Sequence, residues 1–191
     1  MTSGTPMTRS STGDVWTYAE YARLPDDGNR YEVIDGEVLV TPAPGTRHQH
    51  AAARLFMEAY RYVEKHDLGY VLWDVDLLFV EGQFLRPDFL YVPRSRREGI
   101  TDRGVEVTLG LVVEVLSPSS RSIDLMRKPR RYRDFGVPEY RVADRVEKVI
   151  HRFVFEDGDA EPRRIEGTLD WHPPGAPVPL ALDLAHVLAD F

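Results

Sequence analysis

The segment from Leu111 to Leu116 constrains the fold most, because it is apolar on both faces of any strand that it forms. Its sequence is Leu-Val-Val-Glu-Val-Leu. A strand with one face in water alternates polar and apolar residues, whereas a strand covered on both faces is an almost continuous apolar run. The segment therefore predicts a middle strand in a covered sheet, and other parts of the chain must supply the covering layers.

Patterns on both sides of this segment predict those layers. Apolar residues at helical spacing follow Thr46 and Gln49, which are spaced as a capping box, and Gly69 is placed to end that helix. Further elements are predicted as strands over Tyr70 to Val80 and Phe84 to Val92, a helix over Ser122 to Phe135 closed by Gly136, and a strand over Glu139 to Asp144. The two strands before Leu111 are joined by Glu81-Gly82, which indicates a hairpin. The order helix, three strands, helix, strand is that of an α/β sandwich.

The ends of the chain carry simpler signals. Asp35-Gly36 lies between Tyr31 to Ile34 and Glu37 to Val40, which predicts a hairpin because both turn positions favour positive φ. Other segments are expected to form a disordered tail over 1–14, a short helix over Val15 to Leu24, a strand over Val146 to Phe155 with a turn at Glu156 to Gly158, a loop over Pro173 to Pro179, and a helix over Asp183 to Phe191 capped by Asp183. We expect residues 15–191 to form a single domain.

Composition narrows the class of protein. The chain has 191 residues, a net charge of -7 and no cysteine. No apolar run approaches the roughly 20 residues that span a bilayer, and the polar N-terminus lacks a signal sequence, so we expect a cytoplasmic protein without membrane contact. Without thiolates, any metal must be bound by Asp, Glu, His or carbonyl oxygens.

The candidate chemistry lies in a short set of residues. Asp88 follows Arg86-Pro87, Glu114 lies in the apolar strand, and Lys128 follows on the next helix. Two carboxylates at apolar strands with a lysine close behind suit metal-assisted hydrolysis, because Mg²⁺ prefers hard oxygen ligands and takes one or two protein carboxylates plus phosphate oxygens. Pro87 cannot donate to a sheet, so it indicates an edge or an irregularity beside Asp88.

Glu114 needs a partner, because an ionised carboxylate alone in an apolar strand costs several kcal/mol. A metal, a lysine or an arginine would satisfy it, and a buried salt bridge without chemistry is the alternative. Asp124 and Lys128 share a helix face at a spacing of four, which is also the spacing of an ordinary stabilising pair. Tyr132 and Phe135 continue that face, which would direct Lys128 toward the sheet. Pro129 predicts a kink or a helix that begins again at Pro129, because proline inside a helix costs about 3 kcal/mol.

The segment 121–133 is strongly basic. It contains six Lys or Arg residues against Asp124 alone, which is 6 minus 1, or +5, so the rest of the chain carries -12. The overall acidity speaks against a general nucleic-acid coat, whereas a local basic cluster is compatible with contacts to a phosphate backbone. A solvated helix face is the other interpretation.

Taken together, these motifs resemble one known family. The segments that carry the resemblance are Tyr31 to Glu37, Pro42 to His48, Pro87-Asp88, Glu114 to Ser119, Asp124 with Lys128 and Tyr132, and Gly136 to Tyr140. The sequence resembles the Uma-two family of restriction endonucleases within the PD-(D/E)XK nuclease superfamily, from about residue 15 to the end. The resemblance implies a restriction-endonuclease-like αβββαβ core, with a mixed central sheet flanked by helices and an added N-terminal β-hairpin. It also implies a magnesium- or manganese-dependent phosphodiesterase and makes a homodimer plausible.

The resemblance assigns roles by position. Asp88 matches the aspartate of the superfamily motif, and Glu114 matches the acidic residue of its second half; both would be metal ligands. Leu116 stands where that half normally has lysine, so the lysine role passes to Lys128. Glu32 and His48 match further family positions and join the catalytic candidates, although His48, which lies on the inward stripe of its helix, is also compatible with a packing role.

Three functions follow as hypotheses. The first is metal-dependent hydrolysis of a nucleic-acid phosphodiester, with DNA as the expected substrate and with Arg127, Arg130 and Arg131 along the backbone. The second is a catalytically impaired module with the same fold that acts in binding or dimerisation. A two-carboxylate glycosidase is the third, and it would leave Lys128 and the arginines without a role.

Overall fold

The structure is a computed structural model, and it describes residues 7–8, 15–155 and 161–191. Two compact units are present, and each is described by itself. Unit 1 comprises Met1–Ala43, Val75–Arg86 and Glu98–Val107, and unit 2 comprises Pro44–Asp74, Pro87–Arg97 and Thr108–Phe191. The 3-10 helix η1 (Arg94–Gly99) crosses the chain boundary between them. The tail predicted over 1–14 and the turn predicted at Glu156 to Gly158 lie almost wholly outside the described residues, apart from Met7 and Thr8.

Unit 1 contains a seven-stranded sheet in the order β1-β3-β2-β6-β5-β9-β8. Its elements are β1 (Met7–Thr8), α1 (Tyr18–Tyr21), β2 (Arg30–Ile34), β3 (Glu37–Thr41), β5 (Leu77–Val80), β6 (Gln83–Leu85), β8 (Ile100–Thr101) and β9 (Gly104–Val105). The predicted β2–β3 hairpin is confirmed, with φ of 57° at Asp35 and 78° at Gly36. Helix α1 is shorter than predicted, and Thr17 with Glu20 forms its capping box.

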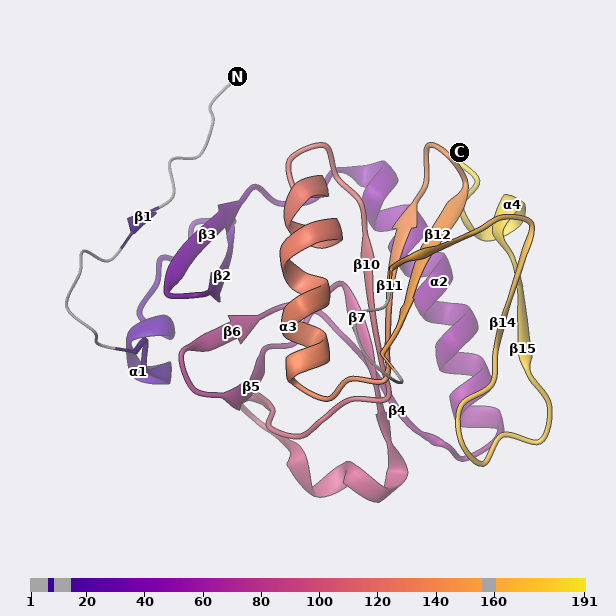
Figure 1. The fold of residues 1–191 in the computed structure, drawn as a ribbon, viewed down its shortest axis with the longest axis horizontal. Coiled ribbons are helices and arrows are strands. Elements are labelled where there is room, and N and C mark those ends of the chain that lie inside the picture. Colours follow the sequence, from indigo (N-terminus) through magenta and orange to yellow (C-terminus); the bar gives the residue numbers. More distant parts are fainter. Residues whose placement is uncertain (1–6, 9–14, 156–160) are drawn as a thin grey trace. The chain divides into compact units, whose positions relative to one another are not determined.

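Unit 2 contains a six-stranded sheet in the order β13-β12-β11-β10-β7-β4 (Figure 1). Its elements are α2 (Thr46–Lys65), β4 (Gly69–Trp73), β7 (Phe89–Pro93), β10 (Leu111–Val115), η2 (Ile123–Arg127), α3 (Lys128–Asp134), β11 (Glu139–Asp144), β12 (Val149–Val154), β13 (Arg163–Ile165), β14 (Thr168–Trp171), β15 (Leu180–Asp183) and α4 (Leu184–Val187). The series α2, β4, β7, β10, α3, β11 has the predicted αβββαβ order. Only the β10–β11 pair is parallel among the pairings within this sheet, so the sheet is mixed and the predicted α/β fold is confirmed.

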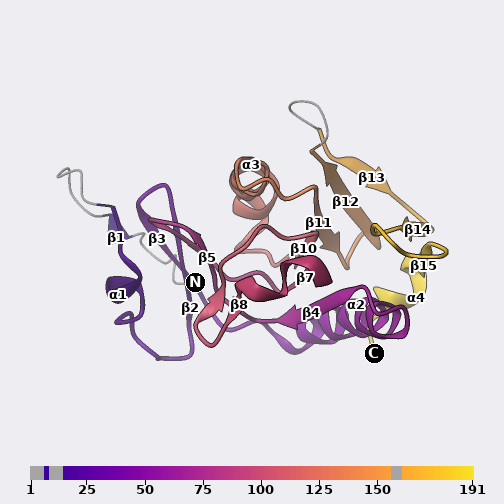
Figure 2. The same ribbon diagram turned by 90° about the horizontal axis from the view of Figure 1, so that it is seen from below.

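The two faces of this sheet are covered by different helices. Helices α2 and α3 lie on opposite sides of β7, β10 and β11 (Figure 2). Val113 and Val115 of β10 pack in one core cluster with Ala52 and Leu55 of α2. Because side chains alternate along a strand, Glu114 points to the other face, toward α3. All five residues of β10 are buried, as the apolar run predicted.

The long strands predicted before Leu111 are each broken in two. The run over Tyr70 to Val80 divides into β4 and β5 at Asp74, where φ is 51°. The run over Phe84 to Val92 divides into β6 and β7 at residues 86–88, the irregularity that Pro87 predicted. The hairpin through Glu81-Gly82 joins only β5 and β6, while β4 pairs with β7 inside unit 2.

Several predicted helix ends are wrong. Thr46 does not cap α2, because the extended Gly45 (φ -70°, ψ 165°) occupies the N-cap position and Thr46 is already helical. The helix ends at Lys65, the left-handed position after it is Asp67 (φ 55°), and Gly69 begins β4. Asp183 caps α4 as predicted, accepting hydrogen bonds from the amides of Ala185 and His186, although the helix is shorter than expected. No helix among the described residues is long and apolar enough to cross a membrane.

Candidate active site

Asp88 lies where the chain enters β7. The β7–β10 register pairs Val112 with Leu90 and Val113 with Phe89, and one further step in the same register sets Glu114 opposite Asp88. The Asp88 carboxylate accepts a hydrogen bond from the Val115 amide at 2.8 Å, and the Asp88 amide donates to Glu114 Oε2 at 3.3 Å. Asp88 is 3% exposed. The break at Pro87 therefore leaves Asp88 outside the regular ladder, with its carboxylate bound to the backbone of β10.

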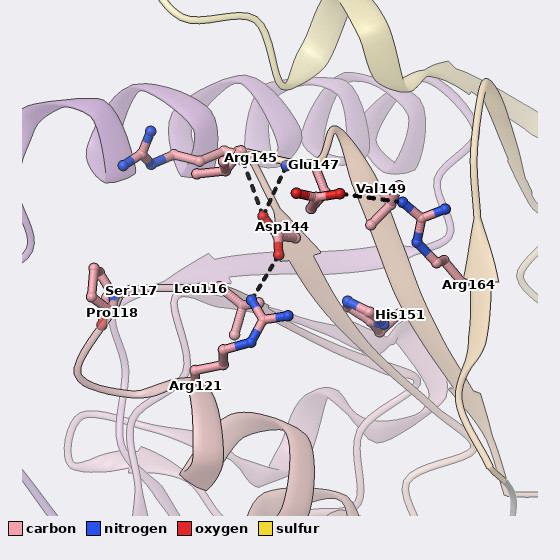
Figure 3. A pocket seen from close by; sticks show the side chains of 11 residues that line it. Leu116, Ser117, Pro118, Arg121, Asp144, Arg145, Glu147, Val149, His151 and Arg164 are labelled. Atoms are coloured by element: carbon pink, nitrogen blue, oxygen red, sulfur yellow. Dashed lines mark hydrogen bonds and ion pairs between the residues drawn. The ribbon is translucent and has the colours of Figure 1, made fainter.

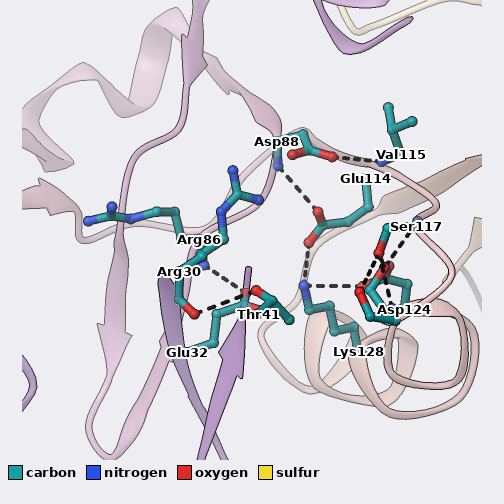
Figure 4. Close-up of polar contacts among 12 residues, drawn as sticks. Arg30, Glu32, Thr41, Arg86, Asp88, Glu114, Val115, Ser117, Asp124 and Lys128 are labelled. Carbon is teal, nitrogen blue, oxygen red and sulfur yellow. Dashed lines mark hydrogen bonds and ion pairs between the residues drawn. The ribbon is translucent and has the colours of Figure 1, made fainter. Parts of the chain in front are cut away.

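Glu114 is satisfied from three directions. Its Oε1 accepts a hydrogen bond from Lys128 Nζ at 2.7 Å (Figure 4). The same oxygen accepts another from the Tyr132 hydroxyl at 3.4 Å. Its Oε2 faces the amide of Asp88. Desolvating a carboxylate costs several kcal/mol, and a charged hydrogen bond of this length to an ammonium offsets that cost. The sequence left a metal, a lysine or an arginine open as the partner of Glu114, and the structure shows the lysine.

Lys128 reaches Glu114 because the helix before it is wound as a π-turn. In η2, the Lys128 amide donates to the carbonyl of Ile123, five residues earlier, and α3 starts at Lys128 with Pro129 in its first turn. Proline is accepted there because it has no amide hydrogen to satisfy. The prediction that a helix begins again here is confirmed, although the helix starts at Lys128, one residue before Pro129. Lys128 itself has helical angles (φ -61°, ψ -39°), contrary to the preference of a residue before proline.

Asp124 and Tyr132 complete the cluster, and the sequence reasoning did not count them as site residues. Asp124 Oδ1 lies 3.2 Å from Lys128 Nζ, and its backbone carbonyl accepts a hydrogen bond from the Tyr140 hydroxyl at 2.9 Å. Lys128 thus lies between two carboxylates (Figure 4). The four-residue spacing of Asp124, Lys128 and Tyr132 was the signal that could have assigned all three to one site.

His48 lies in the first turn of α2 and contacts the same strand end. Its Nε2 is 2.8 Å from the carbonyl oxygen of Val115 and 3.2 Å from Asp88 Oδ2. A hydrogen on Nε2 satisfies the carbonyl, which assigns the tautomer from geometry. Nδ1 is buried and has no hydrogen-bond partner among the described residues. The inward position predicted for His48 is confirmed, and the structure brings it to Asp88.

The remaining predicted residues come from β2, η2 and α3. Glu32 belongs to β2 of unit 1, where it is 3% exposed and its Oε1 accepts a hydrogen bond from the Arg86 amide at 3.0 Å. On α3, Arg130 is exposed, and Arg131 forms an ion pair with Asp134 at 3.1 Å. Arg127 lies half-buried in η2. The catalytic role of Glu32 and the nucleic-acid contacts of the three arginines stay predictions.

A match to a protein-family model shows which family the chain belongs to. The model of the Uma2 family, described as "Putative restriction endonuclease", matches residues 18–185. The chain belongs to the Uma2 family. This is the family that the sequence motifs resembled, and its match includes Asp88, Glu114 and Lys128.

The chain also has the same fold as a solved structure. The chain is similar to a crystal structure from Anabaena variabilis titled as "a putative nuclease belonging to DUF820", with a TM-score of 0.74 and 16% sequence identity. The similarity covers 91% of this chain and 97% of the other, and at this identity it shows the fold alone. Among curated proteins, no significant match was found.

Proposed function

We propose that this member of the Uma2 family is a metal-dependent endonuclease that hydrolyses phosphodiester bonds of nucleic acid. The observation that carries the proposal is the buried contact of Asp88, Glu114 and Lys128. Each of the three is 3% exposed, and they come from β7, β10 and the start of α3. Burying this much charge against one end of a sheet is costly for a purely structural element, which favours a functional reason for it.

The carboxylates suit magnesium by their chemistry. Among the described residues, no group of three or more His, Asp or Glu side chains is arranged to hold a metal. Magnesium does not need such a cage, because it retains water and binds through one or two carboxylates and the phosphate oxygens of its substrate. Asp88 and Glu114 supply two hard oxygen ligands across adjacent strands, so we assign the magnesium or manganese site to them.

Each residue then has a distinct task. When bound, the metal would supply Lewis-acid activation of the phosphate and of a water molecule. Lys128 would place its ammonium near the developing negative charge, and Asp124 would direct the lysine toward Glu114. His48 would fix the orientation of the Asp88 carboxylate. A catalytic role for Glu32, which belongs to unit 1, stays a prediction from the family resemblance.

The substrate is assigned from charge. Arg127, Arg130 and Arg131 come from the basic segment beside Lys128, and guanidinium groups there would contact backbone phosphates rather than bases. DNA is the expected nucleic acid, and a homodimer would place two such sites on a duplex.

A cleavage assay tests the activity. The purified chain is incubated with single- and double-stranded DNA and RNA in Mg²⁺, in Mn²⁺ or in a chelator. We expect metal-dependent cleavage that falls at least 100-fold in Asp88→Asn and Glu114→Gln, because loss of one electrostatic contact to the reacting group costs about that much. Glu58→Gln, which alters a half-buried carboxylate of α2 paired with Arg61, is the matched control and should retain full activity. Equal cleavage by all four proteins would refute the proposal.

A non-catalytic module is the second candidate, and one observation favours it. Lys128 already pairs with both Glu114 and Asp124, so each of these two carboxylates has a cationic partner without a metal. Calorimetric titration with Mg²⁺ separates the two functions. The nuclease requires heat of binding that is lost in Glu114→Gln and kept in Glu58→Gln, whereas a binding module shows no uptake that depends on Glu114.

A further inference from the structure

A cavity lies beyond the end of β10 in unit 2. It has a volume of about 450 Å³ and is lined by Leu116 to Pro118, Arg121, Asp144 to Glu147, Val149, His151 and Arg164 (Figure 3). Cavities that hold small ligands have volumes of about 300–1,000 Å³. The proposed roles of Asp88, Glu114 and Lys128 do not use any of these side chains.

The strand register relates this cavity to Glu114. Glu114 is paired with Val142 on β11, and Val142 is paired with His151 on β12. Directly paired residues share a face of the sheet, so His151 lies on the face of Glu114. Two strand spacings of about 4.8 Å separate the two residues by about 10 Å. Arg164 is paired with His151 one strand further on and shares the same face.

The polar groups in the cavity are arginines, two carboxylates and a histidine, and each arginine has a carboxylate partner. Arg121 is held by Asp144 at 2.8 Å, and the other oxygen of Asp144 accepts hydrogen bonds from the amides of Val146 and Glu147. Both oxygens of Asp144 therefore have partners, and one of them holds Arg121. Arg164 is 3.6 Å from the exposed Glu147 and also pairs with Glu166. Arg145 lines the cavity, but its guanidinium points away and pairs with Asp190 at 3.5 Å (Figure 3).

His151 lines the cavity with a ring nitrogen that could bind a ligand. Its Nε2 is buried and has no hydrogen-bond partner within the described part of the chain. Burial lowers the pKa of His151, and nearby Arg121 and Arg164 lower it further, while Asp144 opposes them. The ring is therefore neutral at physiological pH, so it can hydrogen-bond a ligand without adding to the charge. A buried polar atom without a partner costs free energy that a bound ligand would recover.

We propose that this cavity binds a nucleotide unit through its phosphate group, with Arg121 and Arg164 as the cationic contacts and His151 as a hydrogen-bonding contact. Guanidinium groups match phosphate oxygens in geometry, and the cavity has room for more than a phosphate. The separation of about 10 Å from Glu114 equals about three steps of 3.4 Å measured along the axis of a DNA duplex. If the nucleotide is part of a substrate strand, the inference rests on the proposed nuclease function. Binding of a phosphate in the cavity does not depend on that function.

Calorimetry without metal tests the binding directly. The full chain, in a chelator that prevents cleavage, is titrated with adenosine 5′-monophosphate, with adenosine and with a single-stranded oligonucleotide. We expect the phosphate-bearing ligands to bind and adenosine not to bind. Arg164→Gln should raise the Kd for the phosphate-bearing ligands about tenfold, the usual effect of losing one charged hydrogen bond. His151→Asn, which changes no charge, should raise it less.

The control is the neighbouring arginine of the same strand. Arg163 is exposed and, by strand alternation, lies on the opposite face, paired with Arg152. Arg163→Gln therefore removes the same charge without touching the cavity. Equal affinities of Arg164→Gln and Arg163→Gln for both phosphate-bearing ligands, or the absence of any binding by the unmodified chain, would overturn the inference. Thermal melting of each variant confirms that it is folded.

The same variants identify the source of the nucleotide. If a substrate strand occupies the cavity, Arg164→Gln raises the KM for oligonucleotide cleavage and leaves kcat nearly unchanged. If only a free nucleotide binds, the nucleotide affinity depends on Arg164 while the KM for cleavage does not. If the chain binds the nucleotide through Arg164 but cleaves no nucleic acid, the proposed nuclease function is refuted and the nucleotide site is supported. If the chain cleaves nucleic acid but shows no such binding, the nucleotide site is refuted and the nuclease function is supported.

Discussion

Lys128→Met tests whether the buried lysine holds the candidate site together. Methionine keeps the length of the side chain and removes its charge. The lysine is 3% exposed and contacts Glu114 at 2.7 Å and Asp124 at 3.2 Å. The substitution would leave two buried carboxylates on either side of an apolar side chain. Two further donors to Glu114, the Asp88 amide at 3.3 Å and the Tyr132 hydroxyl at 3.4 Å, form longer and weaker hydrogen bonds than the ammonium.

The size of the effect follows from this geometry. Removing one partner of a buried ion pair costs about 3–5 kcal/mol, because a desolvated charge is left without compensation. At about 2–4 °C per kcal/mol for a chain of this size, the melting temperature should fall by roughly 6–20 °C. Adding Glu114→Gln to Lys128→Met should recover part of the loss, with a coupling energy of about 0.5–3 kcal/mol.

Urea unfolding followed by circular dichroism measures the free energy of unfolding of each variant. Arg130→Met is the matched control, since Arg130 is exposed on the same helix, and it should change stability by no more than about 0.5 kcal/mol. A loss of less than about 1 kcal/mol in Lys128→Met, or a double variant whose loss is the sum of the single losses, would refute the buried ion pair as the element that holds the site.

Three further predictions can be checked by the same unfolding measurements. Burial alone would raise the pKa of Asp144, but hydrogen bonds from Arg121 and from backbone amides outweigh it and hold the pKa below its usual value. This carboxylate therefore stabilises the fold above its unfolded pKa, and its contribution is lost as the pH falls through the folded pKa. Arg121→Gln should be less stable than the unmodified chain at pH 7, and the difference in stability should shrink toward pH 3. Gly69→Ala should destabilise by more than about 2 kcal/mol, because φ is 153° and the added Cβ would lie 2.2 Å from the carbonyl oxygen of Val92; a melting temperature within 2 °C of the original would contradict this. Gly45→Ser should stabilise by a few tenths of a kcal/mol by providing the missing N-cap oxygen, and Gly45→Ala should not.

Local signals in the sequence were sufficient for elements whose cause is local. The Asp35-Gly36 hairpin was predictable because two adjacent residues determine the φ values of the turn. The buried strand β10 was predictable because its apolar run excludes an exposed position, and β11 has the predicted bounds. Local patterns also predicted the order of the core elements, and the family resemblance matched Asp88 and Glu114 to the two halves of one motif.

Positions that depend on distant parts of the chain could not be read in this way. The break of the long strands into β4 with β5 and β6 with β7 reflects which sheet each half joins, and no local pattern distinguishes the halves. The cap of α2 moved from Thr46 to Gly45 because the backbone enters the helix one residue earlier than the side-chain pattern suggests.

The candidate site shows the same division. The sequence by itself determined that Glu114 is buried and needs a cation, since a charge in an apolar strand must be compensated. Only the tertiary structure decided which cation it is. The π-turn before Pro129 directs Lys128 onto Glu114, and the first turn of α2 brings His48 to Asp88. The physical reason is that a burial cost can be inferred from neighbours in the sequence, whereas the group that offsets it is selected by packing between elements that are far apart in the chain.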